Sequence, residues 1–246
     1  TLSLSGGDAI FNNSSVRVDN GATLAVTNNE TIGDLSGAGA VMLGSNTLST
    51  NGSHASTLFA GVIAGTGSLV KQGSGTLTLA GSNTYSGTTM VSAGSLSVTG
   101  STAGAATVAS GATLSGSGTL GGTVNVQSGG TLSPGIGIGS LTVNGDLNMA
   151  SGSTLAVEIS GATAGTQYDQ VFVGGAVDVS GATLSVTHGY VAGQSDSYII
   201  IDNNAADAVN GTFTGIAQGA SFAAGGNSTQ LTASYVGGTG NDFVLT

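Results

Sequence analysis

The chain repeats one short unit, in which a small residue and a hydroxyl residue precede alternating aliphatic side chains. The clearest copies are Gly75-Thr76-Leu77-Thr78-Leu79, Gly94-Ser95-Leu96-Ser97-Val98, Gly111-Ala112-Thr113-Leu114 and Gly130-Thr131-Leu132. Their hydroxyl positions lie 19, 18 and 18 residues apart, and the next spacings, to Thr154 and Thr183, widen to 23 and 29 as inserted loops would make them. Self-similarity at a nearly fixed period predicts a repeat architecture in which each unit stacks on its neighbours.

Within each unit the alternation of aliphatic and hydroxyl residues predicts β-strands with one apolar and one polar face. Three short strands, separated by glycine-rich turns, would close one coil of about 18 residues. A β-sandwich also has short strands at regular spacing, but it does not require the same residue at the same place in each repeat. We therefore predict an all-β fold, a right-handed parallel β-helix (solenoid) with a C-terminal capping region. One buried column would then contain Leu77, Leu96, Leu114 and Leu132, and an outward column would contain Thr76, Ser95, Thr113 and Thr131.

Composition excludes other fold classes. Glycine accounts for 45 of 246 residues, and abundant glycine with small hydroxyl residues argues against a helical protein. A collagen is excluded because there is no Gly-X-Y period and Pro134 is the single proline. Disorder is the remaining alternative, but 39% of the residues are hydrophobic, and they alternate rather than scatter.

The charge balance limits the partners. The formal net charge is −10, and Arg17 and Lys71 are the two basic residues, so nucleic acid and anionic membrane surfaces are poor partners, and we expect no nucleic acid to bind. No apolar run approaches the ~20 residues that a membrane-spanning helix needs. The absence of cysteine removes disulfides, thiolate metal sites and cysteine catalysis.

The composition changes near residue 165. Eight of the eleven aromatic residues lie at or after Tyr168, and the strands there become longer and more apolar, as in Tyr198-Ile199-Ile200-Ile201. The end of a solenoid exposes an unpaired rung and needs a cap. We predict a stem over residues 1–165 and a cap over residues 166–246. The first residues resemble the middle of a strand pattern, so we expect the chain to be part of a longer protein.

Residues 65–98 resemble the passenger-associated transport repeat of bacterial autotransporters. The pieces that carry the resemblance are Leu69-Val70-Lys71, Gly75-Thr76-Leu77-Thr78-Leu79 and Asn83-Thr84-Tyr85-Ser86-Gly87. Upstream, residues 32–39 and 59–63 resemble the coils that precede this repeat. Downstream, residues 129–135 and 169–177 resemble the C-terminal part of such passengers, where an autochaperone segment lies.

The resemblance implies a β-helical passenger that is secreted or held at the surface of a Gram-negative bacterium, tethered to the outer membrane. Its implied partner is its own C-terminal outer-membrane β-barrel, which is absent from this chain. Residues 1–165 would be the β-helical stem of passenger repeats, and residues 166–246 an autochaperone-like cap.

The sequence offers few candidates for chemistry. Residues 237–244 fit one copy of the glycine-rich calcium nonapeptide, with Asp242 as the carboxylate, but such sites need tandem copies. His54 and His188 lie 134 residues apart, and Asp202 and Asp207 are the nearest approach to an acidic cluster. We therefore predict no catalytic, cofactor-binding or metal-binding residues, no cofactor, and no enzyme within these residues.

Isolated polar and aromatic residues have structural interpretations. We expect the ring of Tyr85 to be buried at a coil corner rather than to stack on a ligand. We expect Asp8, Asp19 and Asp34 to lie in solvated turns. Asparagine pairs 12–13 and 28–29 fit turns in which the side chains bond their own backbone.

Three functions remain open. The first is a structural segment that acts as display stem and folding template during outer-membrane secretion. The second is an adhesin or biofilm-type protein that uses its flat hydroxyl face to bind a host surface or a second copy. The third is the stem of an autotransporter whose protease or esterase domain lies upstream of residue 1.

Overall fold

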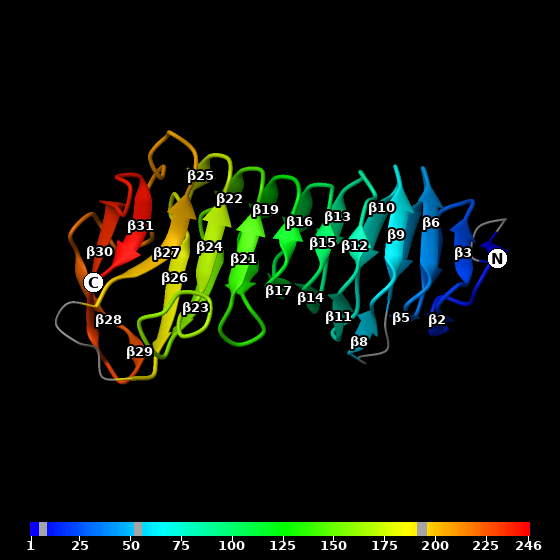
Figure 1. Cartoon of the computed structure of the whole chain (residues 1–246), viewed down its shortest axis with the longest axis horizontal. Coiled ribbons are helices and arrows are strands. Elements are labelled where there is room, and N and C mark those ends of the chain that lie inside the picture. The colour runs from blue at the N-terminus through cyan, green and yellow to red at the C-terminus, as the bar shows by residue number, and fades with distance from the viewer. Residues whose placement is uncertain (5–8, 52–55, 191–195) are drawn as a thin grey trace.

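The chain folds as a β-solenoid, in which short parallel strands stack along one long axis (Figure 1). The computed structural model describes residues 1–4, 9–51, 56–190 and 196–246, and these residues contain strands but no helix. The N-terminus and the C-terminus lie at opposite ends of the stack (Figure 1). The predicted fold class is confirmed.

Each coil contributes strands to three faces. The first face starts with β1 (Leu2–Leu4), β3 (Thr23–Val26), β6 (Ala40–Gly44) and β9 (Val62–Gly65), and continues with β12 (Ser82–Asn83), β15 (Ser101–Thr102), β18 (Thr119–Leu120), β21 (Ser140–Val143), β24 (Gln170–Val173) and β27 (Tyr198–Asn203). The second face contains β2 (Val16–Val18), β5 (Leu35–Gly37), β8 (Thr57–Phe59), β11 (Thr76–Leu79), β14 (Ser95–Val98), β17 (Thr113–Gly116), β20 (Thr131–Pro134), β23 (Thr154–Ile159), β26 (Thr183–His188) and β29 (Gly225–Gly226). The third face contains β4 (Glu30–Ile32), β7 (Thr47–Thr50), β10 (Ser68–Lys71), β13 (Thr89–Val91), β16 (Ala106–Val108), β19 (Val124–Val126), β22 (Leu147–Met149) and β25 (Val177–Asp178).

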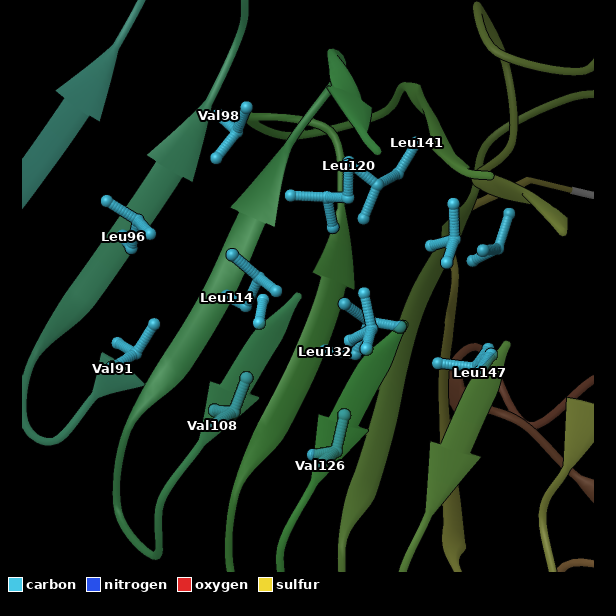
Figure 2. Packing of buried hydrophobic residues seen from close by; sticks show 14 of the residues in the cluster. Val91, Leu96, Val98, Val108, Leu114, Leu120, Val126, Leu132, Leu141 and Leu147 are labelled. Carbon is cyan, nitrogen blue, oxygen red and sulfur yellow. The ribbon is translucent and has the colours of Figure 1, made fainter. Parts of the chain in front are cut away.

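The register stacks equivalent residues of successive coils. On the second face Leu77 pairs with Leu96, Leu96 with Leu114, and Leu114 with Leu132, and all four side chains are buried. The preceding hydroxyl residues pair in the same order and are partly exposed, which confirms both predicted columns. Figure 2 shows Leu96, Leu114 and Leu132 pointing into the interior, together with Val91, Val108 and Val126 of the third face.

The widening of the period comes from loops, as expected. Thr131 pairs with Thr154, and Thr154 pairs with Thr183, so the ladder continues across the longer spacings. The extra residues lie between β20 and β21 and between β23 and β24. The register is therefore kept while the connections grow.

One coil corner is lined by glycines that no other residue can replace. A Cβ on Gly81 would lie 1.8 Å from the carbonyl oxygen of Gly61, and a Cβ on Gly61 would lie 1.8 Å from that of Gly39. The same clash continues at Gly100 and Gly118, at 2.2 and 2.1 Å. These corners approach so closely that backbone contacts backbone, which explains much of the glycine content.

The C-terminal end departs from parallel stacking. Here β31 (Asp242–Leu245) pairs antiparallel with β27 and with β30 (Gln230–Gly237), and β28 (Ser221–Ala223) pairs antiparallel with β30. Phe213, Tyr235 and Phe243 pack together there, with ring centroids 4.8 to 6.3 Å apart. This antiparallel end covers the last parallel rung (Figure 1).

Parallel pairing crosses residue 165 without a break. Strand β21 pairs with β24, and β24 pairs with β27, in the same direction as the coils before them. The strand arrangement therefore does not change at residue 165. The division into residues 1–165 and 166–246 stays a prediction about which parts fold as units.

At the other end, β4 is the edge strand of the third face among the described residues. The backbone amides of Ala9 and Ile10 donate to the buried carboxylate of Glu30, both at 2.9 Å. In the described part of the chain, no helix is long and apolar enough to cross a membrane.

Candidate functional site: the segment of residues 68–98

The segment of residues 68–98 contains the motifs that resemble a known repeat, and it lies where the first face changes from one sheet to the next. Strands β10 to β14 form it, so it spans parts of two successive coils, and their alternating residues place Leu69, Leu77 and Leu96 in the core. The inward-pointing side chains of this segment that carry polar atoms include Lys71, Asn83 and Tyr85, each 4% exposed or less. Buried polar atoms need partners, so their contacts show what the segment does.

Lys71 lies at the end of β10, in a column otherwise occupied by Ile32, Thr50 and Val91. Its ammonium donates to the carbonyl oxygens of Gln72 and Gly73 at 2.6 and 2.9 Å, and to that of Ala93, in the next coil, at 3.3 Å. Burial lowers the pKa of Lys71, and the negative charge of Asp34 opposes that effect. Lys71 thus closes a turn and ties two coils together.

Asn83 lies where the first face changes from one sheet to the next. Strand β9 ends the sheet that starts at β1, and β12 begins the following one. The Oδ1 atom of Asn83 accepts from the backbone amide of Ile63 at 2.9 Å, while its Nδ2 donates to the carbonyl oxygens of Gly81 and Ser101, each at 3.0 Å. One side chain therefore bonds three successive coils across the break.

Tyr85 is fully buried at the next corner, as predicted. Its hydroxyl lies 2.5 Å from Oγ1 of Thr89, and burial raises its pKa to about 12. The ring is therefore a packing element and presents no surface to a ligand.

The expectation for Asp34 is wrong. Asp34 is buried rather than solvated, because it lies between the short strands β4 and β5, where Oγ of Ser15 donates to it at 3.0 Å and the Lys71 charge is near. Asp19 is exposed as expected and pairs with Arg17 at 2.6 Å. Asp8 and His54 lie outside the described residues.

The glycine-rich C-terminal motif folds as a turn between β30 and β31. The carboxylate of Asp242 accepts from the backbone amides of Asn203 and Thr239, at 2.9 and 2.8 Å, and from the Thr239 hydroxyl at 3.1 Å. The side-chain amide of Asn241 donates to the carbonyl oxygens of Asn203 and Ala205. The oxygens that a calcium ion would need are thus engaged by the turn itself.

The remaining candidates do not assemble into a reactive group. His188 is buried in the cap, where Asn227 contacts its Nδ1 at 3.2 Å and the ring of Tyr190 stacks on it. Asp202 lies on β27 and Asp207 in the exposed segment that follows. Within the described ranges, no group of three or more histidine and acidic side chains is placed to hold a metal. The absence of catalytic and metal-binding residues stays a prediction.

Residues 69–98 match the family of the passenger-associated-transport-repeat. The solenoid carries a passenger-associated-transport-repeat. The matched passenger repeat starts at Leu69 and ends at Val98, so it includes Lys71, Asn83 and Tyr85.

A curated relative agrees with this. The chain is 38% identical over 96 residues to the adhesin BmaC autotransporter of Brucella suis biovar 1 (strain 1330). The aligned part is 38% of this chain but 3% of that relative, so the chain spans a small fraction of the relative's length. The predicted resemblance to autotransporter passengers with this repeat is confirmed.

The sequence-based interpretation missed the roles of Lys71 and Asn83 within the passenger repeat. The sequence pattern does mark both residues as unusual, because each stands at an inward position of an alternating strand, where the pattern predicts an aliphatic residue. Nothing in the spacing shows that Asn83 faces a break between sheets.

Proposed function

We propose that this segment is a structural stem and folding template of an adhesin-type autotransporter passenger. The passenger repeat and the adhesin relative support a passenger role, secreted or displayed through the outer membrane of a Gram-negative bacterium. Its partner in that process would be its own C-terminal barrel, to which we propose it stays tethered.

The observation that carries the template role is the unequal packing of the two ends. The antiparallel C-terminal end buries Tyr198, Phe213 and Phe243, whereas the core of the stem is built mainly from leucine, valine and isoleucine. Aromatic side chains bury more apolar area, so residues 166–246 should fold most stably. The folded C-terminal rung presents unpaired strand edges on which the preceding coils can add one at a time.

The test compares two buried aliphatic residues at opposite ends of the intact protein. Ile200→Ala in β27 and Leu24→Ala in β3 each remove a side chain that is at most 2% exposed, and each should destabilise the fold by about 2–5 kcal/mol. If the cap is the template, Ile200→Ala reduces passenger at the cell surface much more than Leu24→Ala does. Phe172 is unsuitable for this comparison because it lies half-exposed on the outer side of β24.

The amount of barrel in the outer membrane is measured in parallel, so that loss of display is not confused with loss of expression. Equal display of both variants, or a greater loss with Leu24→Ala, would contradict the template role.

A further inference from the structure

Outward positions of the strands mostly carry small or hydroxyl residues, and three of the large apolar exceptions lie on two neighbouring coils. Met42 and Leu58 are 45% and 54% exposed, and Val62 is 41% exposed. Leu58 pairs with Thr78, and serines occupy that column in the following coils, at positions 97, 115 and 133. Met42 stands between Ala25 and Ala64 in its own column.

Leu58 and Val62 border two adjoining hollows at the corner between the first and second faces, and Met42 stands on β6 two residues after Ala40, which lines one of them. One hollow, of about 660 Å³, is lined by Arg17, Asp19, Leu58 and neighbouring small residues. The other, of about 370 Å³, is lined by residues 20–23, 38–40 and 60–62. Asn20, Ala38 and Ala60 line both, so the hollows are continuous. The surface thus carries an apolar ridge (Met42, Leu58, Val62) beside a trough.

The charges at this place are self-complementary. Of the two basic side chains, Lys71 is buried, so Arg17 carries the positive side-chain charge that this acidic chain shows at its surface. Arg17 pairs with Asp19 inside its own chain, and both side chains are at least 70% exposed. Such an exposed pair contributes little stability, so it can exchange partners easily.

We propose that this ridge and trough form an interface with a second copy of the same chain. A twofold contact uses the same patch on both copies, and therefore needs a projection and a matching hollow on one surface. Two copies related in this way would place each ridge in the other trough, with each Arg17 facing the Asp19 of the other copy.

The patch is smaller than a standard interface of about 20–30 residues a side, so the contact between isolated chains is weak. Many copies on one surface would strengthen it through multivalency. Dimerisation is measured on the purified chain, whereas the template role is measured by the amount of passenger at the cell surface. Either result can therefore fail without the other.

The test is sedimentation equilibrium of the whole purified chain over a concentration series. We expect a reversible monomer–dimer equilibrium, weakened at least about tenfold by Leu58→Asp, because a charge would enter the apolar contact. Ile136→Asp is the matched control, since Ile136 is 67% exposed on another part of the surface, and it should leave the equilibrium unchanged. Both positions are exposed, and thermal melting checks that both variants stay folded.

A charge exchange decides whether the contact is twofold. Arg17→Asp places two acids at the patch, and Asp19→Arg places two bases there, so each variant alone should dimerise less than the wild type. An equimolar mixture should recover dimer, as a heterodimer of the two variants. A wild-type chain that stays monomeric up to about 1 mM, in the weak-affinity range, overturns the proposal. A dimer insensitive to Leu58→Asp, or a mixture with no recovery, overturns it equally.

Discussion

Single polar side chains inside the solenoid act as ties between coils. Asn83 bonds Ile63, Gly81 and Ser101, and Lys71 bonds the turn after β10 and Ala93 of the next coil. In both cases the side chain bonds backbone groups of its own coil and of a neighbouring coil. Removing such a side chain leaves buried donors or acceptors unpaired, which costs more than the bond itself contributes.

Asn83→Leu keeps the volume of the side chain but leaves the Ile63 amide without its acceptor. We expect a loss of about 1–3 kcal/mol in the free energy of unfolding. Urea denaturation measures this loss of unfolding free energy. Asn148→Leu is the control, because Asn148 is half-exposed on β22 and bonds a side chain, that of Asn125 at 3.0 Å, rather than backbone groups of other coils. Equal losses for the two variants would show that Asn83 is not a special tie.

Asp169 makes stability depend on pH. Its buried carboxylate accepts from the amides of Gly139 and Glu158, each at 2.8 Å, and burial raises its pKa to about 6 from a reference value of 3.8. The folded state therefore binds a proton between about pH 6 and 4 that the unfolded state does not bind. This group's contribution to stability rises as pH falls through that window.

Asp169→Asn removes the titration. The difference in unfolding free energy between wild type and variant should shift in favour of the wild type as pH falls from about 6 to about 4. Urea denaturation at a series of pH values measures it. A difference that is constant over this range would show that the carboxyl keeps an ordinary pKa.

At the scale of elements, corner positions accept fewer types of residue than the outward positions of the strands do. A strand tolerates Thr or Ser at an outward position, as the column from Thr76 to Thr183 shows. The corner at Gly61 and Gly81 tolerates no side chain, since backbone atoms of successive coils are in contact. The distance between coils is set by the ladder hydrogen bonds and cannot widen at one corner alone.

Gly81→Ala should therefore destabilise the chain by at least about 2 kcal/mol, because its Cβ would overlap the carbonyl oxygen of Gly61. Gly189→Ala is the matched control, since a Cβ there would meet Ile159 at an ordinary 3.8 Å. Thermal melting compares the two. A Gly81→Ala protein as stable as Gly189→Ala would show that the coils can separate locally.

The turn between β30 and β31 should be independent of calcium. Asp242 already accepts two backbone amides and one hydroxyl, which occupy three of the roughly four acceptor sites of its carboxylate. We expect the melting temperature to stay the same with chelator and with millimolar calcium. A rise of several degrees on adding calcium would show that the ion displaces these hydrogen bonds.

At the scale of the whole molecule, a solenoid need not unfold all at once. Each coil contacts mainly its neighbours, so stability is close to a sum over coils and their interfaces. The antiparallel end adds contacts between distant residues, such as the Tyr235 hydroxyl, which accepts from the Phe213 amide and donates to the Ile216 carbonyl oxygen. This end should open last.

Limited proteolysis in rising denaturant tests that order. The last surviving fragment, identified by mass, should contain residues 166–246, because the aromatic cluster and the antiparallel pairing lie there. Survival of an N-terminal fragment after this region has been digested would reverse the order.

The repeat unit by itself determined the stacking of coils, because a residue that recurs every 18 or 19 positions can be buried each time only if the coils are parallel and in register. Leu77, Leu96, Leu114 and Leu132 and their hydroxyl neighbours were placed correctly for that reason. Periodicity does not record where a ladder is interrupted or which strand is last. The tie at Asn83, the burial of Asp34, the hydrogen bonds of Asp242 and the ridge at Leu58 were decided by the tertiary structure. Each depends on which residues of other coils lie beside it, and that neighbourhood exists only once the coils are stacked.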